Sequence, residues 1–140
     1  MASANVLILP KRLADAYFTG TYKLMLVTAA PDETALDTYD FRDDVTGVEV
    51  PNSGTYVAGG AAVSCTVGAV DTTNNRVPVT FGNPATWTGT TISAVGAWIY
   101  KVIGSAATDQ LVTFIDFGGT VSSTAGDFDV TILTPLYVNR

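Results

Sequence analysis

Two stretches decide the fold class: Trp87-Thr-Gly-Thr-Thr-Ile-Ser-Ala-Val-Gly-Ala-Trp-Ile-Tyr100 and, after a short polar gap, Leu111-Val-Thr-Phe-Ile-Asp-Phe-Gly-Gly119. Alternate residues of an extended chain share one face, and both faces of the first stretch are largely apolar from Ile92 onward. This pattern predicts two antiparallel strands joined by a loop, with the first strand inside a sandwich or between subunits. Gly96 beside Trp98 leaves room for a bulky neighbour or for another backbone.

Further strands are expected before this pair. Tyr22–Thr28 is apolar on both faces, which predicts a central strand of a sheet. The turn-forming residues Asp71–Asn75 separate residues 61–70 from Arg76–Phe81, and this arrangement predicts a hairpin. We expect Gly82-Asn-Pro84 to end its second arm.

The rest of the chain supplies a helix, a turn and a last strand. Pro10–Phe18 is predicted to be a short helix, because proline suits the first helical position and Gly20 can close the end. Gly118–Gly119 is expected to be a turn. Asp127–Leu133 alternates between polar and apolar residues and predicts a strand that points Phe128, Val130 and Ile132 inward.

Short strands separated by Gly, Asn, Pro and Asp are typical of all-β proteins. We therefore expect an all-β fold, a single antiparallel β-sandwich or jelly-roll-like domain over residues 1–140 with one short N-terminal helix. Its less regular parts are expected to be an extended N-terminal arm at residues 1–9, an acidic loop excursion at 32–50 and a C-terminal arm at 134–140.

The amino-acid composition excludes some classes of function. Charged residues make up 14% of the chain, against about 25% in an average soluble domain, while hydrophobic residues make up 47%. No run of about 20 apolar residues is present, so we expect no membrane span. The net charge of −6 disfavours nucleic-acid binding, because that depends on Lys and Arg neutralising phosphates. The apolar excess favours burial in a core and against other subunits.

Residues suited to catalysis are few. The chain has no histidine, which removes the common nucleophile pairs, the usual zinc sites and the commonest general base. The single cysteine, Cys65, lies in an apolar stretch and is expected to be a buried, reduced thiol. Asp127 and Asp129 share a strand face and could form a pair of carboxylates such as glycosidases use. Any solvated face of a strand shows the same alternation, however. Asp116 is expected to play a structural part, capping backbone amides or meeting a base.

Seven acids between Asp32 and Glu49 suggest a solvated loop or, less readily, a metal site. Their spacing differs from that of a calcium-binding EF-hand loop, so we expect neither a metal ion nor any cofactor. The aromatic residues raise a different alternative, a carbohydrate-binding β-sandwich module that stacks sugars on exposed rings. Against it, Trp98 and Tyr100 lie in a strand with two apolar faces, which favours the core or a subunit contact.

Four segments in order resemble a group of small β-rich structural proteins of tailed-bacteriophage virions. They are Tyr22-Lys-Leu-Met-Leu-Val-Thr28, Gly54-Thr-Tyr-Val-Ala-Gly-Gly60, Trp87-Thr-Gly-Thr-Thr-Ile-Ser-Ala with Gly96-Ala-Trp-Ile-Tyr100, and Ile115-Asp-Phe-Gly118. The acidic segment departs from that group. The resemblance implies a non-enzymatic virion component with a small β-sandwich or jelly-roll fold.

Within that class we expect a head decoration, or cement, protein that is made in the host cytoplasm and then joins the virion. The alternative is a subunit of the neck, tail or fibre. The expected partners are the major capsid protein or other virion proteins, and further copies of the chain itself, as a homotrimer. The candidate subunit-interface residues are Trp87, Trp98, Tyr100 and Tyr137.

Overall fold

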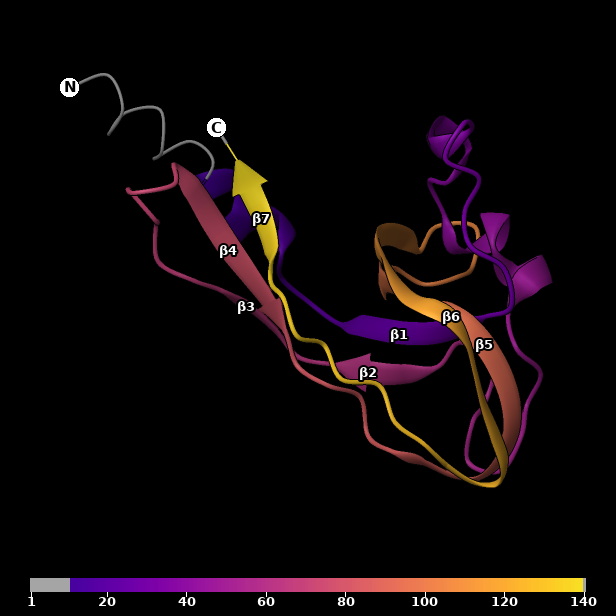
Figure 1. The fold of residues 1–140 in the computed structure, drawn as a ribbon. Coiled ribbons are helices and arrows are strands. Elements are labelled where there is room, and N and C mark those ends of the chain that lie inside the picture. The colour runs from indigo at the N-terminus through magenta and orange to yellow at the C-terminus, as the bar shows by residue number, and fades with distance from the viewer. Residues whose placement is uncertain (1–10, 140) are drawn as a thin grey trace. The chain divides into compact units, whose positions relative to one another are not determined.

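The computed structural model describes residues 11–139 and shows a mostly β protein with two antiparallel sheets (Figure 1). The prediction of a β-rich fold with one short helix is confirmed. The chain divides into two compact units, one made of residues 21–63 and 84–130 and the other of residues 11–20, 64–83 and 131–139. Each unit contains one of the sheets. The expected N-terminal arm at residues 1–9 lies outside the described part.

The larger unit holds a four-stranded sheet in the order β2-β1-β5-β6. Its strands are β1 (Tyr22–Val27), β2 (Ala61–Val63), β5 (Trp87–Lys101) and β6 (Gln110–Phe128). β1 pairs with β2 on one side and with β5 on the other, as predicted for a strand that is apolar on both faces. Its residues from Leu24 to Val27 are fully buried.

β5 and β6 form the long antiparallel pair that the first two stretches predict. Trp98 lies opposite Phe114, and the ring of Phe114 and the carbonyl oxygen of Ile115 occupy the space where a side chain on Gly96 would stand. The prediction that Gly96 makes room for a bulky neighbour is confirmed. From Gly96 to Tyr100 both faces of β5 are buried.

Gly118–Gly119 is not a turn between two strands. Both glycines lie inside β6 with positive φ angles of 76° and 156°. The register jumps there, with Ala94 opposite Val121 and Gly96 opposite Asp116, so residues 117–120 form a large irregular bulge opposite Val95. Bulges and turns need the same backbone conformations, which is why the glycine pair predicted the wrong one.

The end of β6 also differs from the prediction. The strand stops at Phe128, and residues 129–134 have no strand pairing, so Asp127–Leu133 is not a strand of its own. The expected alternation of burial still holds at its start, because Phe128 and Val130 are buried while Asp127 and Asp129 are exposed.

The acidic excursion connects β1 to β2 and contains three single-turn 3₁₀ helices. These are η1 (Leu36–Thr38), η2 (Arg42–Asp44) and η3 (Thr46–Val48). After them the chain returns to β1, where the amide of Val50 donates to the carbonyl oxygen of Leu26 at 3.0 Å.

The smaller unit holds a three-stranded sheet in the order β3-β4-β7, with β3 (Cys65–Val67), β4 (Arg76–Phe81) and β7 (Leu136–Asn139). The predicted hairpin is present, with Asn75 in the left-handed conformation at φ 54°. Residues 61–70 are not one strand, however. They divide at Ser64 into β2, which pairs with β1, and β3, which pairs with β4.

β7 lies in the expected C-terminal arm at residues 134–140. It pairs with β4 of the same chain, from Arg76 opposite Asn139 to Val79 opposite Leu136. In the same unit, residues 11–17 form the predicted helix, and Gly20 follows it with φ 91°. The ring of Phe18 packs on that of Phe81, with centroids 6.3 Å apart.

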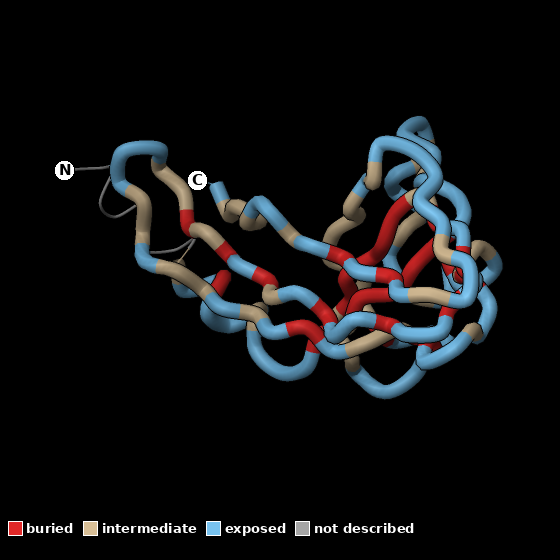
Figure 2. Tube along the Cα trace, turned by 60° about the horizontal axis from the view of Figure 1, so that its bottom comes forward, coloured by how far each residue is buried: buried red, intermediate tan, exposed pale blue. Residues whose placement is uncertain are grey.

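Most buried residues follow the inner strands of each sheet, and most loop residues are exposed (Figure 2). Large side chains dominate the core of the four-stranded sheet. Those that are fully buried include Tyr22, Tyr56, Tyr100, Leu24, Met25, Leu26 and Ile99.

Candidate functional site

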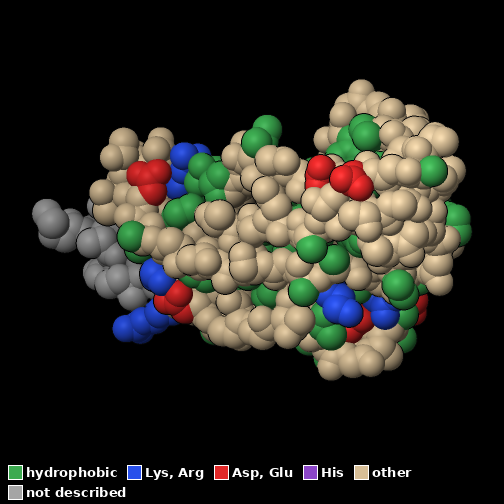
Figure 3. Space-filling model, turned by 90° about the horizontal axis from the view of Figure 1, so that it is seen from below, with side chains coloured by type: hydrophobic (Ala, Val, Ile, Leu, Met, Phe, Trp, Pro, Cys, Tyr) green, Lys and Arg blue, Asp and Glu red, His purple; other side chains and the backbone are tan. Residues whose placement is uncertain are grey.

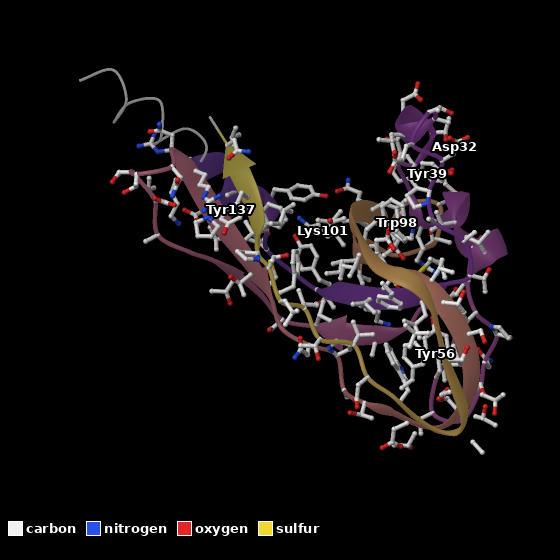
Figure 4. The ribbon with its side chains drawn as sticks, viewed as in Figure 1. Asp32, Tyr39, Tyr56, Trp98, Lys101 and Tyr137 are labelled. Carbon is white, nitrogen blue, oxygen red and sulfur yellow. The ribbon has the colours of Figure 1, made fainter. Side chains whose placement is uncertain are left out.

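Two of the four candidate interface residues belong to one buried cluster beside the acidic excursion. Trp98 stacks on Tyr39 with ring centroids 6.0 Å apart and packs against Phe114 at 5.3 Å (Figure 4). Tyr100 lies in the same cluster, together with Met25, Val27 and Val45. Trp98 is 7% exposed and Tyr100 is 2% exposed. These rings stabilise the junction between the excursion and the sheet of their own chain.

The hydroxyl of Tyr100 is also satisfied internally. It donates a 2.5 Å hydrogen bond to the carbonyl oxygen of Gly59, and burial raises its pKa to about 12. The guanidinium of Arg42 lies 5.1 Å from the centre of its ring. The phenol therefore stays protonated at neutral pH and holds the loop before β2 against β5.

The other two candidate residues lie elsewhere. Trp87 is 4% exposed and packs edge-on against Tyr56, with centroids 5.2 Å apart. Tyr137 lies on β7, is half-buried, and has the guanidinium of Arg76 3.6 Å from its ring centre. The structure thus brings Trp98 and Tyr100 together and places Trp87 and Tyr137 in separate surroundings.

Burial of both tryptophans bears on the carbohydrate alternative. A sugar-stacking platform needs ring faces that solvent can reach, and neither Trp87 nor Trp98 offers one. The platform that this alternative assumed is therefore not formed by those two residues.

The acidic excursion is fixed to the β5–β6 loop by an ion pair that the sequence did not suggest. Arg42 Nε lies 2.9 Å from Asp109 Oδ2, and the second oxygen, Oδ1, accepts the amides of Ile103 at 2.8 Å and Gly104 at 3.1 Å. Main-chain bonds run beside it, since the amide of Arg42 donates to the carbonyl oxygen of Asp109 and that of Leu111 donates to Asp40.

Asp109 is one of two buried polar residues in the part of the chain that the structure describes, with 3% exposure. Burial alone would raise its pKa, but the amides of Ile103 and Gly104 and the charge of Arg42 outweigh that effect and lower the pKa below its usual value. The carboxylate is therefore ionised at neutral pH and satisfied on both oxygens. This arrangement is structural, and it gives the excursion a defined position.

A second polar network holds the chain between the excursion and β2. The hydroxyl of Tyr56 accepts the amide of Leu26 at 3.0 Å and donates to Glu49 Oε1 at 2.8 Å. The same carboxylate oxygen accepts the amide of Gly59 at 2.5 Å. Burial raises the pKa of Tyr56 well above its usual value. Glu49 thus belongs to the fold and not to a solvated acidic surface.

Two other acids that the sequence analysis considered, Asp116 and Asp129, also accept hydrogen bonds within the chain. Asp116 Oδ1 accepts the amide of Gly118 at 2.8 Å, which confirms the expected capping of backbone amides. Asp129 is bonded to the hydroxyl of Thr86. Cys65 is half-buried, not fully buried as expected.

Within residues 11–139, no three Cys, Asp or Glu side chains lie close enough to hold a metal ion. None of the helical segments in that range has the length and apolar character needed to cross a bilayer.

The surface is notable for apolar side chains rather than for charge. On the face shown in Figure 3, the charged groups form a few small clusters, and in several of them Lys or Arg lies beside Asp or Glu. Several large apolar residues are more than 40% exposed: Leu13, Leu36, Val57, Ile103, Val121 and Leu133. The sequence analysis missed these residues, because exposure of a single apolar residue in a loop leaves no periodic signal.

Comparisons with protein-family models, with curated proteins and with solved structures found no match to this chain.

Proposed function

We propose that this protein is a non-enzymatic structural component of a tailed-bacteriophage virion, and specifically a head decoration protein that binds and stabilises the capsid lattice. The proposal rests on the order of the four segments that resemble such proteins. The exposed apolar residues support it, since a surface poor in charge and rich in large apolar side chains is typical of a protein that works in contact with others.

The proposed partners are the major capsid protein and further copies of this chain, with three copies in the unit that attaches to the shell. We also propose that the two antiparallel sheets belong to one β-sandwich or jelly-roll-like domain. Trp87, Trp98 and Tyr100 are buried within a single chain. In this proposal they stabilise the strand that carries them and do not touch the partner themselves.

The number of copies per particle tests the proposal. In purified virions of the phage that encodes the chain, a decoration protein would be present in numbers comparable to the major capsid protein, and antibody labelling would cover the whole head. A few copies confined to one vertex would instead favour the alternative, a neck, tail or fibre subunit. Absence from purified particles would overturn both.

A further inference from the structure

β7 is held in its sheet by few contacts (Figure 1). Among the strands that the structure describes, β4 is its only neighbour, and none of its four residues is fully buried. The segment before it, residues 129–134, has no strand pairing, and its Ile132 donates its amide to Asn83 Oδ1 at 2.7 Å. A strand with little burial that follows an unpaired segment opens at a low free energy. β7 can therefore leave β4 without the loss of any pairing in the four-stranded sheet.

β4, in contrast, needs a strand at the position that β7 occupies. The carbonyl oxygen of Pro78 accepts the amide of Gly68 on the β3 side, so the alternation of an antiparallel ladder directs the backbone groups of Val77 and Val79 toward β7. Both valines are fully buried. If β7 left, their amides and carbonyls would lose their partners and their apolar side chains would lose cover. An open β4 edge would therefore bind another strand.

The side chains make this edge suited to β7 in particular. Tyr137 of β7 lies against the guanidinium of Arg76, which is 3.6 Å from the centre of its ring (Figure 4). Arg76 is in turn placed by Asp71, whose Oδ2 lies 3.3 Å from Nε. Val138 comes opposite Val77, so apolar side chains meet across the two strands. All of these contacts join β7 to β4 or to its hairpin, and none of them requires β7 to belong to the same chain.

We propose that β7 of one copy of this chain exchanges onto β4 of a second copy, in the register that it has within the single chain. The closed and exchanged forms then contain the same β4–β7 contacts, and they differ mainly in the path of residues 129–135. A short flexible linker gives its own strand an effective concentration on the order of mM. Copies crowded side by side on a capsid lattice would compete at a similar concentration.

This inference rests on the proposed function for that crowding, and it deepens the function by naming the strand that links neighbouring copies. Each copy gives one strand and receives one, so the exchange closes into a symmetric ring, of which the proposed homotrimer is one case. Two linked copies separate only when β7 opens. The exchange would therefore hold an assembly together more firmly than contacts between surface side chains alone.

Cysteine cross-linking on the purified chain distinguishes the two forms. In a Cys65→Ser background, one set of chains carries Val77→Cys and another carries Val138→Cys, and the two sets are unfolded and refolded together at high concentration. Val77 and Val138 are directly opposed, and the Cα atoms of such a hydrogen-bonded pair are about 5.5 Å apart, which suits a disulfide. Exchange should therefore give a covalent dimer of the two kinds of chain, whereas closed chains keep the two cysteines apart.

The matched control replaces Val77→Cys with Thr80→Cys, because Thr80 also lies on β4 but comes opposite Thr66 of β3 and opposite no residue of β7. We expect about tenfold less covalent dimer in this control mixture. A chain that carries both Val77→Cys and Val138→Cys should close its own disulfide after refolding at low concentration. Hydrogen exchange supplies the folding control, since the amides of β1 should keep their protection in every variant.

Three results would overturn the exchange. One is an equal yield of covalent dimer in the test and control mixtures, and another is no dimer in either while the double variant closes its own disulfide. The third is a folded double variant that forms no internal disulfide, because the pairing of β4 with β7 would then be wrong. The proposed function fails separately, since absence of the chain from purified virions would leave the cross-linking results unchanged.

Discussion

Arg42 and Asp109 are 67 residues apart in the sequence, yet their side chains meet with Nε 2.9 Å from Oδ2. The exposed fraction is 20% for the Arg42 side chain and 4% for that of Asp109. Because one partner comes from the acidic excursion and the other from the loop between β5 and β6, this pair determines where the excursion lies on the sheet.

Removing the carboxylate should destabilise the fold. Asp109→Ala leaves Arg42 half-buried without its partner and leaves the amides of Ile103 and Gly104 without an acceptor. We expect a loss of about 3 kcal/mol in the free energy of unfolding, measured with urea. Asp37→Asn is the control, since Asp37 is exposed in the same excursion, and it should change stability by less than about 0.5 kcal/mol. Equal losses would contradict a specific role for Asp109.

The same carboxylate predicts sensitivity to acid. The folded-state pKa of Asp109 is lower than its unfolded value of 3.8, so its ionised form stabilises the fold above that value. This contribution is lost as the pH falls through the folded pKa. Because Tyr39 stacks on Trp98, tryptophan fluorescence should report the release of the excursion below about pH 4. The Asp109→Asn variant should lose this acid step; if it keeps the step unchanged, other carboxylates cause it.

Gly96 should not tolerate a side chain. A Cβ atom there would meet the ring of Phe114 and would lie 2.5 Å from the carbonyl oxygen of Ile115. We expect Gly96→Ala to cost about 2–3 kcal/mol, as overpacking of a core does. Gly104→Ala is the control, because no atom lies within 4 Å of the added group. Thermal unfolding of both variants measures the difference, and similar midpoints would contradict the close packing.

Tyr56 should matter through its hydroxyl group. Tyr56→Phe keeps the ring but leaves the buried amide of Leu26 without its acceptor and removes the donor to Glu49. The expected loss is about 2 kcal/mol. Tyr137→Phe keeps the ring beneath Arg76 and should be close to neutral. Urea unfolding of the pair tests this, and a neutral Tyr56→Phe would show that solvent replaces the lost bonds.

Alternation along the strands and turn-forming residues were enough to predict part of the fold. The β5–β6 pair, the central place of β1 and the hairpin around Asp71 follow from alternation and turn chemistry. Alternation does not specify which sheet a strand joins, so the division of residues 61–70 at Ser64 was missed. The glycine pair at 118–119 has the same φ preferences in a bulge as in a turn, so sequence alone could not separate the two.

The candidate site was harder to predict, because it depends on contacts between distant residues. Nothing in the excursion indicates which of its acids are solvated and which are bonded, and Glu49 has its partners at Tyr56 and Gly59. Trp98 and Tyr100, which were predicted at a subunit contact, are buried because β5 lies between β1 and β6 and because Tyr39 and Val45 of the excursion pack against them. Tertiary packing decides both outcomes.

The smaller unit is assembled from three separate pieces of chain, and its strand β7 comes from the last of them. During synthesis, residues 64–83 are made before residues 136–139. β4 must therefore wait with one side unpaired until translation reaches the end of β7. The three-stranded sheet is thus completed late, after the four strands of the larger unit have all been made.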